Sequence, residues 1–418
     1  MIVAHLGPPT GRRGGPAGYL AQLQGALAGH GSGSHRVLLP SGGGNGAASP
    51  ATAPDPALVA IRRLRRTWLG APAFDRPSDA DLRCEGGPVH QSIEATWLEI
   101  RRDIGPALEA GLSAPADVLF AHDAPSAEAA LSRRGRGQQV WLLMHSPMPL
   151  ALYLAWSFGV PDREWQGVAA CPDVVEWITR ELRVCESVDR LFLPCREAGE
   201  ELVRGDGRFR PVVARASMLM TGAAAPVRGG AQPRSHWGLP DEVPIGLFLG
   251  TAQPYRGLDL LLAAVRRLGR SDPAGVIAVA GCSADQIPFH PRLRALGPVS
   301  DVGDLLAAVD VVVNVNRFSL FDLSTIEALE AGRPLLLTPV GGNLTFESLG
   351  AGCVMLESLE PAAIAGGMAA VFGLSRADRA AMGARSRACY EAQLTPRHLR
   401  QRHVDLYDEV AATSGARA

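Results

Sequence analysis

The chain of 418 residues contains no lysine, so all 41 of its basic residues are arginines. A site that needs a fixed cation must therefore use arginine, whose planar guanidinium binds carboxylate or phosphate through parallel hydrogen bonds. Neither sign of charge is in excess, because 42 acidic residues bring the formal net charge to −1. Without an acidic or basic tail, this composition argues against a nucleic-acid binder and favours an enzyme-like globule.

Long apolar runs and paired cysteines are missing as well. No stretch reaches the roughly 20 apolar residues of a membrane span. The seven cysteines are scattered, odd in number and never in a C-x-x-C pair, so neither a disulfide framework nor a zinc site is indicated. The N-terminal sequence has no apolar segment of signal-peptide length. We therefore expect a protein of the reducing cytoplasm.

Short apolar runs alternate with helical patterns along most of the chain. The strand pattern MIVAHLG is followed by the helical pattern YLAQLQGALAGHG, and further strand patterns are HRVLLP, DVLFAHD, QVWLLMHS, DRLFLPC and VVARASMLM. A second series begins with IGLFLG and continues through GVIAVAG and DVVVNVN to PLLLTPV. Such alternation predicts parallel sheets that are covered by helices on both faces.

We predict an α/β fold with two facing Rossmann-like, doubly wound domains and a cleft between them. The first domain is expected at residues 1–222, a Gly- and Pro-rich linker at 223–235 and the second domain at 236–394. The helical pattern at 395–418 either ends the second domain or crosses back onto the first. Open α/β sheets bind ligands where loops leave the carboxyl ends of strands, so the site should lie on such loops.

The sequence STIE, from Ser324 to Glu327, follows a strand pattern and the irregular loop NRFSLFDL. It fits the S-x-x-E capping box, in which the serine and glutamate side chains cap the first helical turn. A functional interpretation is equally open. Amides near Leu323 and Ser324 could bind a diphosphate at the positive helix end, and Glu327 could accept hydrogen bonds from a ribose diol.

Other candidates also follow strand patterns. Arg256, in FLGTAQPYRGLDLL, is placed to neutralise the same diphosphate, and Gly14 and Gly15 allow close approach to a phosphate or sugar before a helix. His145 and His122 end two strand patterns, where an imidazole could donate to a substrate. A solvated arginine and structurally satisfied histidines are the ordinary alternatives for these residues.

Two further motifs have weaker support. Asp79 and Asp81 resemble the D-x-D that binds metal–nucleotide-sugar complexes in one class of transferases, but they lie in polar sequence with no flanking strand pattern, so we assign no metal site. The basic run IRRLRRTWLG includes Arg62–Arg66 and could touch an anionic membrane. A solvated helix face explains such a run equally well.

The order of the motifs resembles glycosyltransferase family 4, retaining enzymes of the GT-B fold that use nucleotide-diphosphate sugars. The resemblance covers nearly the whole chain and rests on GGPAGYLAQL, DVLFAHDAPSA, VWLLMHS, SVDRLFLPCREAGEEL, LFLGTAQPYRGLDLLLAAV, VAGCS, LGPVSDVGDLLAAVDVVV and FDLSTIEALEAGRPLLLTPVGGN. It implies transfer of a sugar, with a UDP-sugar as the favoured donor and an unknown hydroxyl acceptor. It implies neither a metal nor a resident cofactor, and the first and second domains would bind acceptor and donor, respectively.

The resemblance also implies roles for individual residues. Glu327 would bind the nucleotide ribose, and His145 would lie near the reacting sugar. The donor diphosphate would contact Gly14, Gly15, Arg256, Leu323 and Ser324, the base would contact Val299, and the donor sugar would contact Ser319, Phe321 and Asp322.

Two departures from the family pattern set this sequence apart. Ser319 stands where the family has the first glutamate of its E-x7-E motif, and Thr251 stands where it has an arginine. We expect an unusual donor sugar, compensation by a residue such as Arg317, or altered activity. The departures also keep other hypotheses open: a pseudo-glycosyltransferase, a nucleotide-sugar epimerase, or a degenerate nucleotide-binding subunit. A two-lobed binding protein is disfavoured by the predicted diphosphate site.

Overall fold

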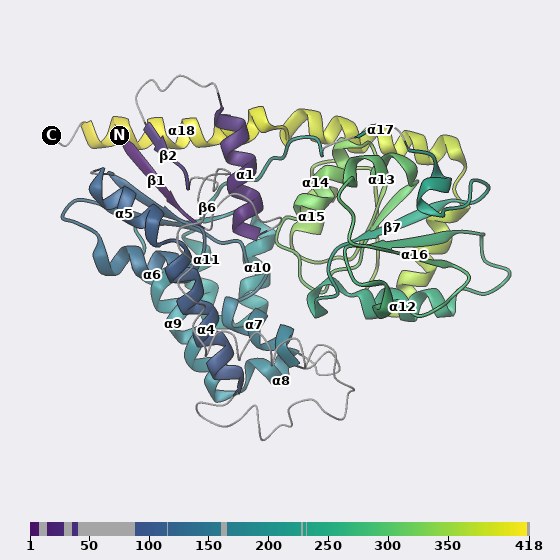
Figure 1. Ribbon diagram of the computed structural model, residues 1–418, viewed down its shortest axis with the longest axis horizontal. Coiled ribbons are helices and arrows are strands. Elements are labelled where there is room, and N and C mark those ends of the chain that lie inside the picture. The colour runs from purple at the N-terminus through teal and green to yellow at the C-terminus, as the bar shows by residue number, and fades with distance from the viewer. Residues whose placement is uncertain are drawn as a thin grey trace. The chain divides into compact units, whose positions relative to one another are not determined.

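The computed structural model describes residues 1–7, 15–28, 36–40, 88–114, 116–159, 165–226, 229–230 and 232–415 (Figure 1). The chain divides into two compact units, and neither is one continuous stretch of sequence. The first consists of Met1–Pro194, Gly199–Met220 and Arg400–Ala418, and the second of Cys195–Ala198 and Thr221–Leu399. The predicted domain limits at residues 222, 235 and 394 stay predictions.

The first unit contains a six-stranded sheet in which every neighbouring pair is parallel, with strand order β2-β1-β3-β4-β5-β6. Its strands are short apolar runs, and β3 is buried at all four positions, as expected for a sheet covered on both faces. The strands are β1 (Ile2–Leu6), β2 (Arg36–Leu38), β3 (Val118–Ala121), β4 (Gln139–Leu143), β5 (Arg190–Leu193) and β6 (Ser217–Met218).

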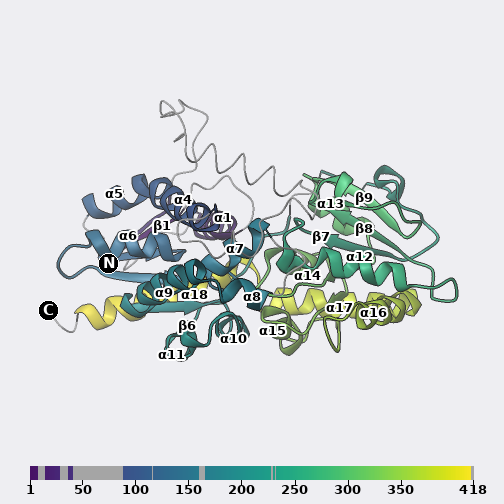
Figure 2. The same cartoon turned by 90° about the horizontal axis from the view of Figure 1, so that it is seen from below.

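Helices flank this sheet, as Figures 1 and 2 show from two directions. Local sequence signals start several of them. Asp123, for example, caps the next helix by accepting a hydrogen bond from the Ser126 amide at 2.8 Å. The helices are α1 (Gly15–Leu27), α4 (Pro88–Asp103), α5 (Gly105–Ser113), α6 (Ala124–Arg133), α7 (Leu150–Gly159), α8 (Trp165–Ala169), α9 (Pro172–Ser187), α10 (Arg196–Gly205) and α11 (Arg210–Ala214).

The strand prediction for VVARASMLM is wrong over its first half. The two valines lie in α11, and only Ser217–Met218 pair with β5 as β6. The β-branched pair favours a strand by intrinsic propensity. Here a preceding proline at the start of the helix and burial of Val212 override that preference.

The second unit repeats the plan with a parallel sheet of order β12-β11-β10-β7-β8-β9. The strands are β7 (Ile245–Leu249), β8 (Val276–Ala280), β9 (Leu293–Gly297), β10 (Val311–Asn314), β11 (Leu335–Leu337) and β12 (Cys353–Met355). The helices are α12 (Leu258–Arg267), α13 (Val302–Ala308), α14 (Leu323–Glu330), α15 (Gly342–Ser348), α16 (Pro361–Gly373) and α17 (Arg376–Gln393). The predicted α/β class with two doubly wound parallel sheets is confirmed.

The core of the second unit forms where α12 and α16 pack against the sheet. Leu261 from α12, Ile277 from β8 and Met368 from α16 are fully buried members of one apolar cluster. All five residues of β8 are buried, so this strand is apolar throughout rather than alternating. Burial of such side chains stabilises the unit by about 1.5–3 kcal/mol each.

The last helix, α18 (Pro396–Gly415), begins in the second unit, and its residues from Arg400 on belong to the first. In Figure 1 this yellow helix follows α17 and lies alongside β1 and α1. His403 and Tyr407 are fully buried there. Among the described helices, none combines the length and apolar character that crossing a membrane requires.

The two strand orders fix where each sheet can bind a ligand. In the first sheet the order reverses between β1 and β3, and in the second it reverses between β7 and β10. Loops that leave the carboxyl ends of the two strands at such a switch point diverge to opposite faces and leave a crevice. The residues that follow β7 and β10 are therefore the first place to look for a site.

Candidate functional site

Two loops of the second unit meet at the switch point between β7 and β10. Arg256 ends the short 3₁₀ turn Pro254–Arg256 after β7, and Asp322 immediately precedes α14 after β10. The Arg256 Nη1 atom lies 3.2 Å from Asp322 Oδ2. The arginine and aspartate side chains are 20% and 13% exposed, so the ion pair is partly open to solvent.

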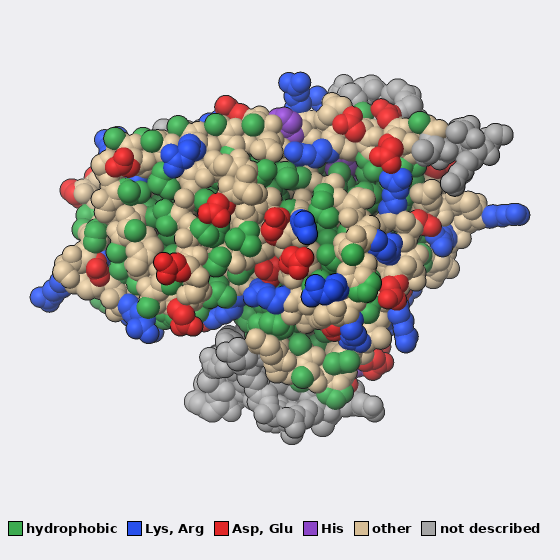
Figure 3. All heavy atoms as spheres, turned by 180° about the vertical axis from the view of Figure 1, so that it is seen from behind, with side chains coloured by type: hydrophobic (Ala, Val, Ile, Leu, Met, Phe, Trp, Pro, Cys, Tyr) green, Lys and Arg blue, Asp and Glu red, His purple; other side chains and the backbone are tan. Residues whose placement is uncertain are grey.

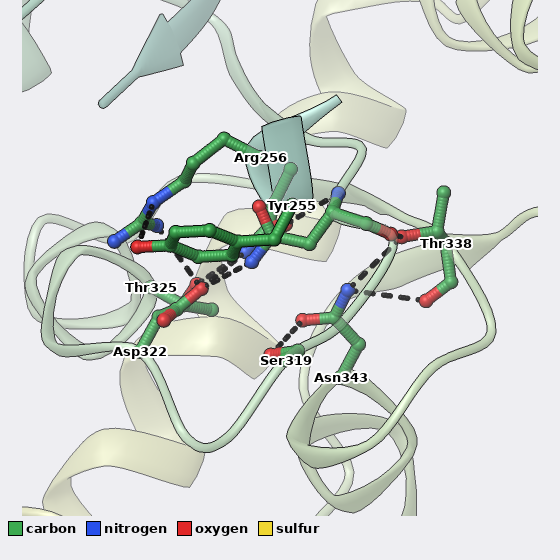
Figure 4. A network of polar contacts seen from close by, with 9 residues as sticks. Tyr255, Arg256, Ser319, Asp322, Thr325, Thr338 and Asn343 are labelled. Carbon is green, nitrogen blue, oxygen red and sulfur yellow. Dashed lines mark hydrogen bonds and ion pairs between the residues drawn. The ribbon is translucent and has the colours of Figure 1, made fainter. Parts of the chain in front are cut away.

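The same Asp322 oxygen accepts two more hydrogen bonds, which Figure 4 shows converging on it. Asn316 Nδ2 donates at 2.6 Å and Asn314 Nδ2 at 3.2 Å. Asn314 Nδ2 also lies 3.1 Å from the Thr325 hydroxyl. Because three donors hold one carboxylate oxygen, the loop before α14 is fixed to the end of β10.

Arg256 is held from its other side by Tyr255. The Arg256 Nε donates to the Tyr255 hydroxyl at 3.1 Å, and the guanidinium carbon lies 5.1 Å from the centre of the tyrosine ring. Gly257 follows with φ +71°, where a Cβ atom would lie 2.1 Å from the Val315 carbonyl oxygen. Glycine at this position therefore lets α12 begin at Leu258, with Gly257 as its N-cap.

A small hollow, partly open to solvent, lies between these loops. Arg256 lines it from one loop and Ser324 from the start of α14. Its full lining is Phe248, Leu249, Arg256, Val312, Val313, Asn314, Asn316, Ser324 and Thr325. The hollow thus combines apolar strand ends with a cation, amides and a hydroxyl, the mixture typical of small-molecule sites.

The N-terminus of α14 does not form the capping box that Ser324 and Glu327 suggested. The N-cap residue is Asp322, and Ser324 is the second residue inside the helix. The Asp322 carbonyl accepts from the amides of Thr325 and Ile326 at 3.1 and 3.2 Å. The amides of Leu323 and Ser324 come before these two bonded amides, in the first turn and at the positive end of the helix.

Three residues grouped as donor-sugar contacts lie in different surroundings. Asp322 lines the switch point, but the Phe321 ring stacks on Phe346 with centroids 4.4 Å apart, and Ser319 is fully buried. The Ser319 hydroxyl lies 3.2 Å from Asn343 Oδ1, so it donates within the unit. A contact between Ser319 and a sugar would require this loop to move, and that role stays a prediction.

The structure does not support compensation by Arg317. Its Nη1 and Nη2 atoms donate to the two Asp259 oxygens at 2.7 and 2.5 Å, and Nη1 also donates to the Pro254 carbonyl. This two-pronged ion pair ties the guanidinium to α12. Thr251, the other departure, is exposed after β7.

Other predicted site residues have these positions. Glu327 is partly exposed on α14, one turn beyond the hollow, and Val299 is partly exposed two residues after β9. Gly15 begins α1 with φ +54° and has nothing within 4 Å of a Cβ built on it. Gly14, Arg62–Arg66, Asp79 and Asp81 lie outside the described residues.

His145 lies in the first unit, two residues after β4 ends, and is partly exposed. Loss of solvent around the ring lowers its pKa to about 3. The imidazole is therefore neutral at pH 7, with one nitrogen that donates and one that accepts. His122, which follows β3, is fully buried and lies 3.0 Å from His145 between ring nitrogens.

Charge and metal ligands are sparsely grouped. On the face of the molecule drawn in Figure 3, basic and acidic side chains are intermixed, without a broad field of one sign. Among the described residues, no three histidine, cysteine or acidic side chains come together in a way that could hold a metal ion. Within the second unit, the candidate site is therefore the hollow that Arg256 and the start of α14 border.

Comparisons with known proteins agree with this architecture. Residues 243–372 match the family described as Glycosyl transferases group 1. A D-inositol 3-phosphate glycosyltransferase of Streptomyces griseus is 29% identical over 236 residues, 46% of this chain and 48% of that protein. The chain thus spans about half the length of this curated relative.

Solved structures resemble the chain over more of its length. Sucrose-phosphate synthase from Thermosynechococcus elongatus has a TM-score of 0.63 at 17% identity and covers 99% of this chain and 98% of its own. Anabaena HepE in complex with UDP-glucose has a TM-score of 0.54 at 12% identity, with 73% of this chain and 82% of that chain covered. At such identities the likeness shows the fold.

The class that these findings define is the GT-B fold of glycosyltransferases, as the sequence predicted. More particularly, residues 243–372 match the model of the group 1 glycosyl transferases. The matched residues include β7 to α14 and with them the whole hollow. Membership of family 4 within this class stays a prediction.

Sequence reasoning missed the residues that organise the hollow. Asn314 and Asn316 are two positions apart at the end of β10, a spacing that puts them on one side of an extended chain. That Asn-x-Asn pair was a usable signal. Tyr255 and Thr325 carried none, because ordinary loop and helix residues acquire their contacts only through folding.

Proposed function

We propose that this protein is a glycosyltransferase that moves a sugar from a nucleoside-diphosphate sugar to an acceptor hydroxyl with retention at the anomeric carbon. The observation that carries the proposal is the hollow at the switch point between β7 and β10. There an arginine side chain and a helix N-terminus border one space. A diphosphate needs this combination of a cation and free amides.

The diphosphate would bind between the Arg256 guanidinium and the amides of Leu323 and Ser324. Tyr255 and Asp322 fix the arginine before any ligand arrives, so little side-chain entropy would be lost on binding. The α14 dipole adds a positive potential at the same point. In the transition state these groups would stabilise the charge that develops on the leaving diphosphate.

The nucleoside would extend from the diphosphate along α14. Glu327 lies one turn inside the helix and is partly exposed, so its carboxylate can accept two hydrogen bonds from the ribose diol. Val299, after β9, is proposed to contact the base. UDP is the favoured nucleotide, and the UDP-glucose complex of HepE supports that choice for the first experiment.

The acceptor is proposed to be a small hydroxylated molecule. The curated relatives act on D-inositol 3-phosphate, so a cyclitol phosphate is the first acceptor to test. The reaction itself would depend on positioning and on stabilisation of leaving-group charge. The departing phosphate would take the acceptor proton, so the proposal requires no protein nucleophile.

Thermal-shift measurements with UDP, GDP, ADP and dTDP sugars test the proposal directly. The sugars of one nucleotide should raise the melting temperature. Glu327→Ala and Arg256→Ala should each require at least a tenfold higher ligand concentration for the same rise. Arg317→Ala is the matched control, because Arg317 pairs with Asp259 outside the hollow. If Arg256→Ala and Glu327→Ala bind as tightly as the unaltered protein, the assigned site is wrong.

The buried Ser319 favours a second candidate of the same fold. A carboxylate that contacts the donor sugar is missing at this position, and the serine hydroxyl is enclosed. A pseudo-glycosyltransferase, an epimerase or a nucleotide-binding partner subunit could dispense with it. Product analysis with a labelled donor separates these candidates, since only a glycosyltransferase forms a labelled glycoside.

A further inference from the structure

Three histidine rings and one tyrosine hydroxyl form a continuous line in the first unit. The Tyr407 hydroxyl lies 2.8 Å from His5 Nε2, and His5 Nδ1 lies 2.8 Å from His122 Nε2. His122 Nδ1 then lies 3.0 Å from His145 Nε2. Each contact has hydrogen-bond length, so both nitrogens of His5 and of His122 are used within the line.

Four separate elements bring these residues together. His5 is in β1, His122 follows β3, His145 follows β4, and Tyr407 comes from α18. The line therefore runs across the carboxyl ends of β1, β3 and β4, starting at the switch point of the first sheet. This is the edge at which open α/β sheets bind ligands.

The line is closed to solvent except at one end. Tyr407 and His122 are fully buried and His5 is 1% exposed, whereas His145 is partly exposed. Neighbouring rings enclose it: His5 stacks on Phe120 with centroids 4.9 Å apart, and the His145 ring lies 4.7 Å from that of Tyr19. Of the four residues in the line, His145 is therefore the one that a ligand could contact.

Burial determines how many protons the line carries. Loss of solvent, and secondarily the neighbouring histidines, lower the pKa of His5 and His122 well below the usual value, and loss of solvent also lowers that of His145. Burial raises the pKa of Tyr407 well above its usual value. At pH 7 each ring therefore has one N–H, and the tyrosine keeps its O–H.

Only two proton arrangements satisfy all three contacts. In the first, Tyr407 donates to His5, His5 and His122 each donate from Nδ1, and His145 accepts at Nε2 and carries its own proton on Nδ1. In the second, every bond is reversed, and His145 Nδ1 has a lone pair. The first arrangement is favoured because a phenol O–H is a stronger donor than a neutral imidazole N–H, and an imidazole nitrogen is a stronger acceptor than a phenol oxygen, across the 2.8 Å contact.

We propose that Tyr407, His5 and His122 are positioning residues that hold the His145 ring with its proton on Nδ1, so that it presents a neutral N–H donor at the ligand-binding edge of the first sheet. The use of that donor in catalysis depends on the proposed function, but the proton arrangement does not. The N–H would donate to a hydroxyl or phosphate oxygen of a ligand that binds at this edge of the first sheet. With the reversed arrangement a lone pair would face the ligand, and it would repel a phosphate oxygen and could only accept from a hydroxyl.

Nitrogen-15 NMR of the full-length protein with labelled histidine tests the proton arrangement. Comparison with His145→Gln identifies the His145 signals, which should show a protonated Nδ1 and an unprotonated Nε2. Tyr407→Phe removes the donor that orients the line, so the two His145 nitrogen shifts should move toward each other as the tautomers mix. A proton on Nε2 in the unaltered protein, or shifts unchanged in Tyr407→Phe, overturns the proposal.

Tyr19→Phe is the matched control. Tyr19 is also buried and its hydroxyl lies 2.9 Å from His403 Nε2, next to the same rings but outside the line. Loss of this hydroxyl should leave the His145 tautomer unchanged. If Tyr19→Phe mixes the tautomers as strongly as Tyr407→Phe does, general loosening of the unit explains the effect and the proposed line has no special role.

A sugar-transfer assay separates this inference from the proposed function. With a donor that binds, Tyr407→Phe should lower kcat about tenfold and change KM less than twofold, since an outer partner that orients a reacting group typically costs that much. An unchanged kcat overturns the positioning role. If the unaltered protein transfers sugar from no donor while the NMR shifts behave as expected, the proposed function fails and the proton arrangement stands.

Discussion

The Asp322 carboxylate and the Arg256 guanidinium form an ion pair, with 3.2 Å between Oδ2 and Nη1, inside the proposed diphosphate site. The cation that would bind phosphate is thus already paired with a negative charge. Arriving phosphate must share the guanidinium with Asp322, and the two anions repel each other. Asp322 therefore limits the affinity of the site while it fixes the position of Arg256.

Asp322→Asn should tighten binding of a nucleoside diphosphate. The amide oxygen can still accept hydrogen bonds from the two asparagines, but the negative charge is gone. Removal of a like charge near the ligand is worth ~1 kcal/mol at a partly exposed site, which corresponds to roughly a fivefold lower Kd. Titration calorimetry at low and high salt measures this gain, which should shrink as salt screens the charges. Asp259→Asn, which frees Arg317 instead, is the control, and equal gains in both variants would contradict the assignment.

Glu327→Gln should weaken nucleotide binding by about tenfold, because a hydrogen bond to a charged acceptor contributes roughly 1.5–3 kcal/mol. A ligand that lacks the ribose hydroxyls sharpens the measurement. The loss should be large with the ordinary nucleotide and nearly absent with its 2′,3′-dideoxy counterpart. Equal losses with both ligands would mean that Glu327 acts on some other part of the nucleotide.

Gly257→Ala should destabilise the second unit by about 2–4 kcal/mol. Its φ of +71° disfavours any side chain, and a Cβ would lie 2.1 Å from the Val315 carbonyl oxygen. Gly238→Ala separates the two causes, since Gly238 has φ +61° but nothing within 4 Å of a Cβ. It should cost only about 1 kcal/mol. Urea unfolding of both variants checks the difference, and equal costs would show that the clash relaxes.

Stability of the first unit should fall as pH rises through the titration of Glu181. This side chain is fully buried, and burial raises its pKa to about 7, against hydrogen bonds from the amides of Leu150 and Ala151. A carboxyl group with a raised folded pKa binds more protons in the folded state. Its contribution is therefore complete below the unfolded pKa near 4.5 and is lost as pH rises through about 7.

Glu181→Gln should remove that dependence. The amide oxygen can still accept from Leu150, which donates to Glu181 Oε2 at 2.7 Å. The free energy of unfolding of the variant, minus that of the unaltered protein, should be about 2–3 kcal/mol higher at pH 8 than at pH 5. Unfolding by urea at both pH values gives this difference. A difference that is the same at both pH values for Glu181→Gln would contradict the buried titration.

The sequence predicted the sheets well, because their strands are continuous apolar runs bounded by loops. The run DVVVNVN gave β10, and the order of motifs gave the GT-B fold. It failed at VVARASMLM, where tertiary packing of Val212 outweighed a β-branched pair. Local propensity predicts elements that agree with their environment and fails where packing decides.

The candidate site was predictable only in part. Arg256 and the start of α14 could be placed at strand ends from the sequence. The hydrogen bonds from Asn314 and Asn316 to Asp322 could not be predicted. Those contacts depend on the path of the intervening loop. His122 and His145 were each identified singly at strand ends. Their connection to Tyr407 depends on α18, and the sequence did not determine which unit this helix packs against.

The division of each unit into separated stretches has a consequence for biosynthesis. His403, Tyr407 and Val410 are at most 3% exposed, and they complete a unit whose strands are all made before residue 220. Domains usually fold in the order in which the ribosome releases them. Here the first unit cannot complete its folding, and an apolar face stays uncovered, until the whole of the second unit has been translated. Newly made chains that stop short of Arg400 should therefore be clients for chaperones even when their second unit has folded.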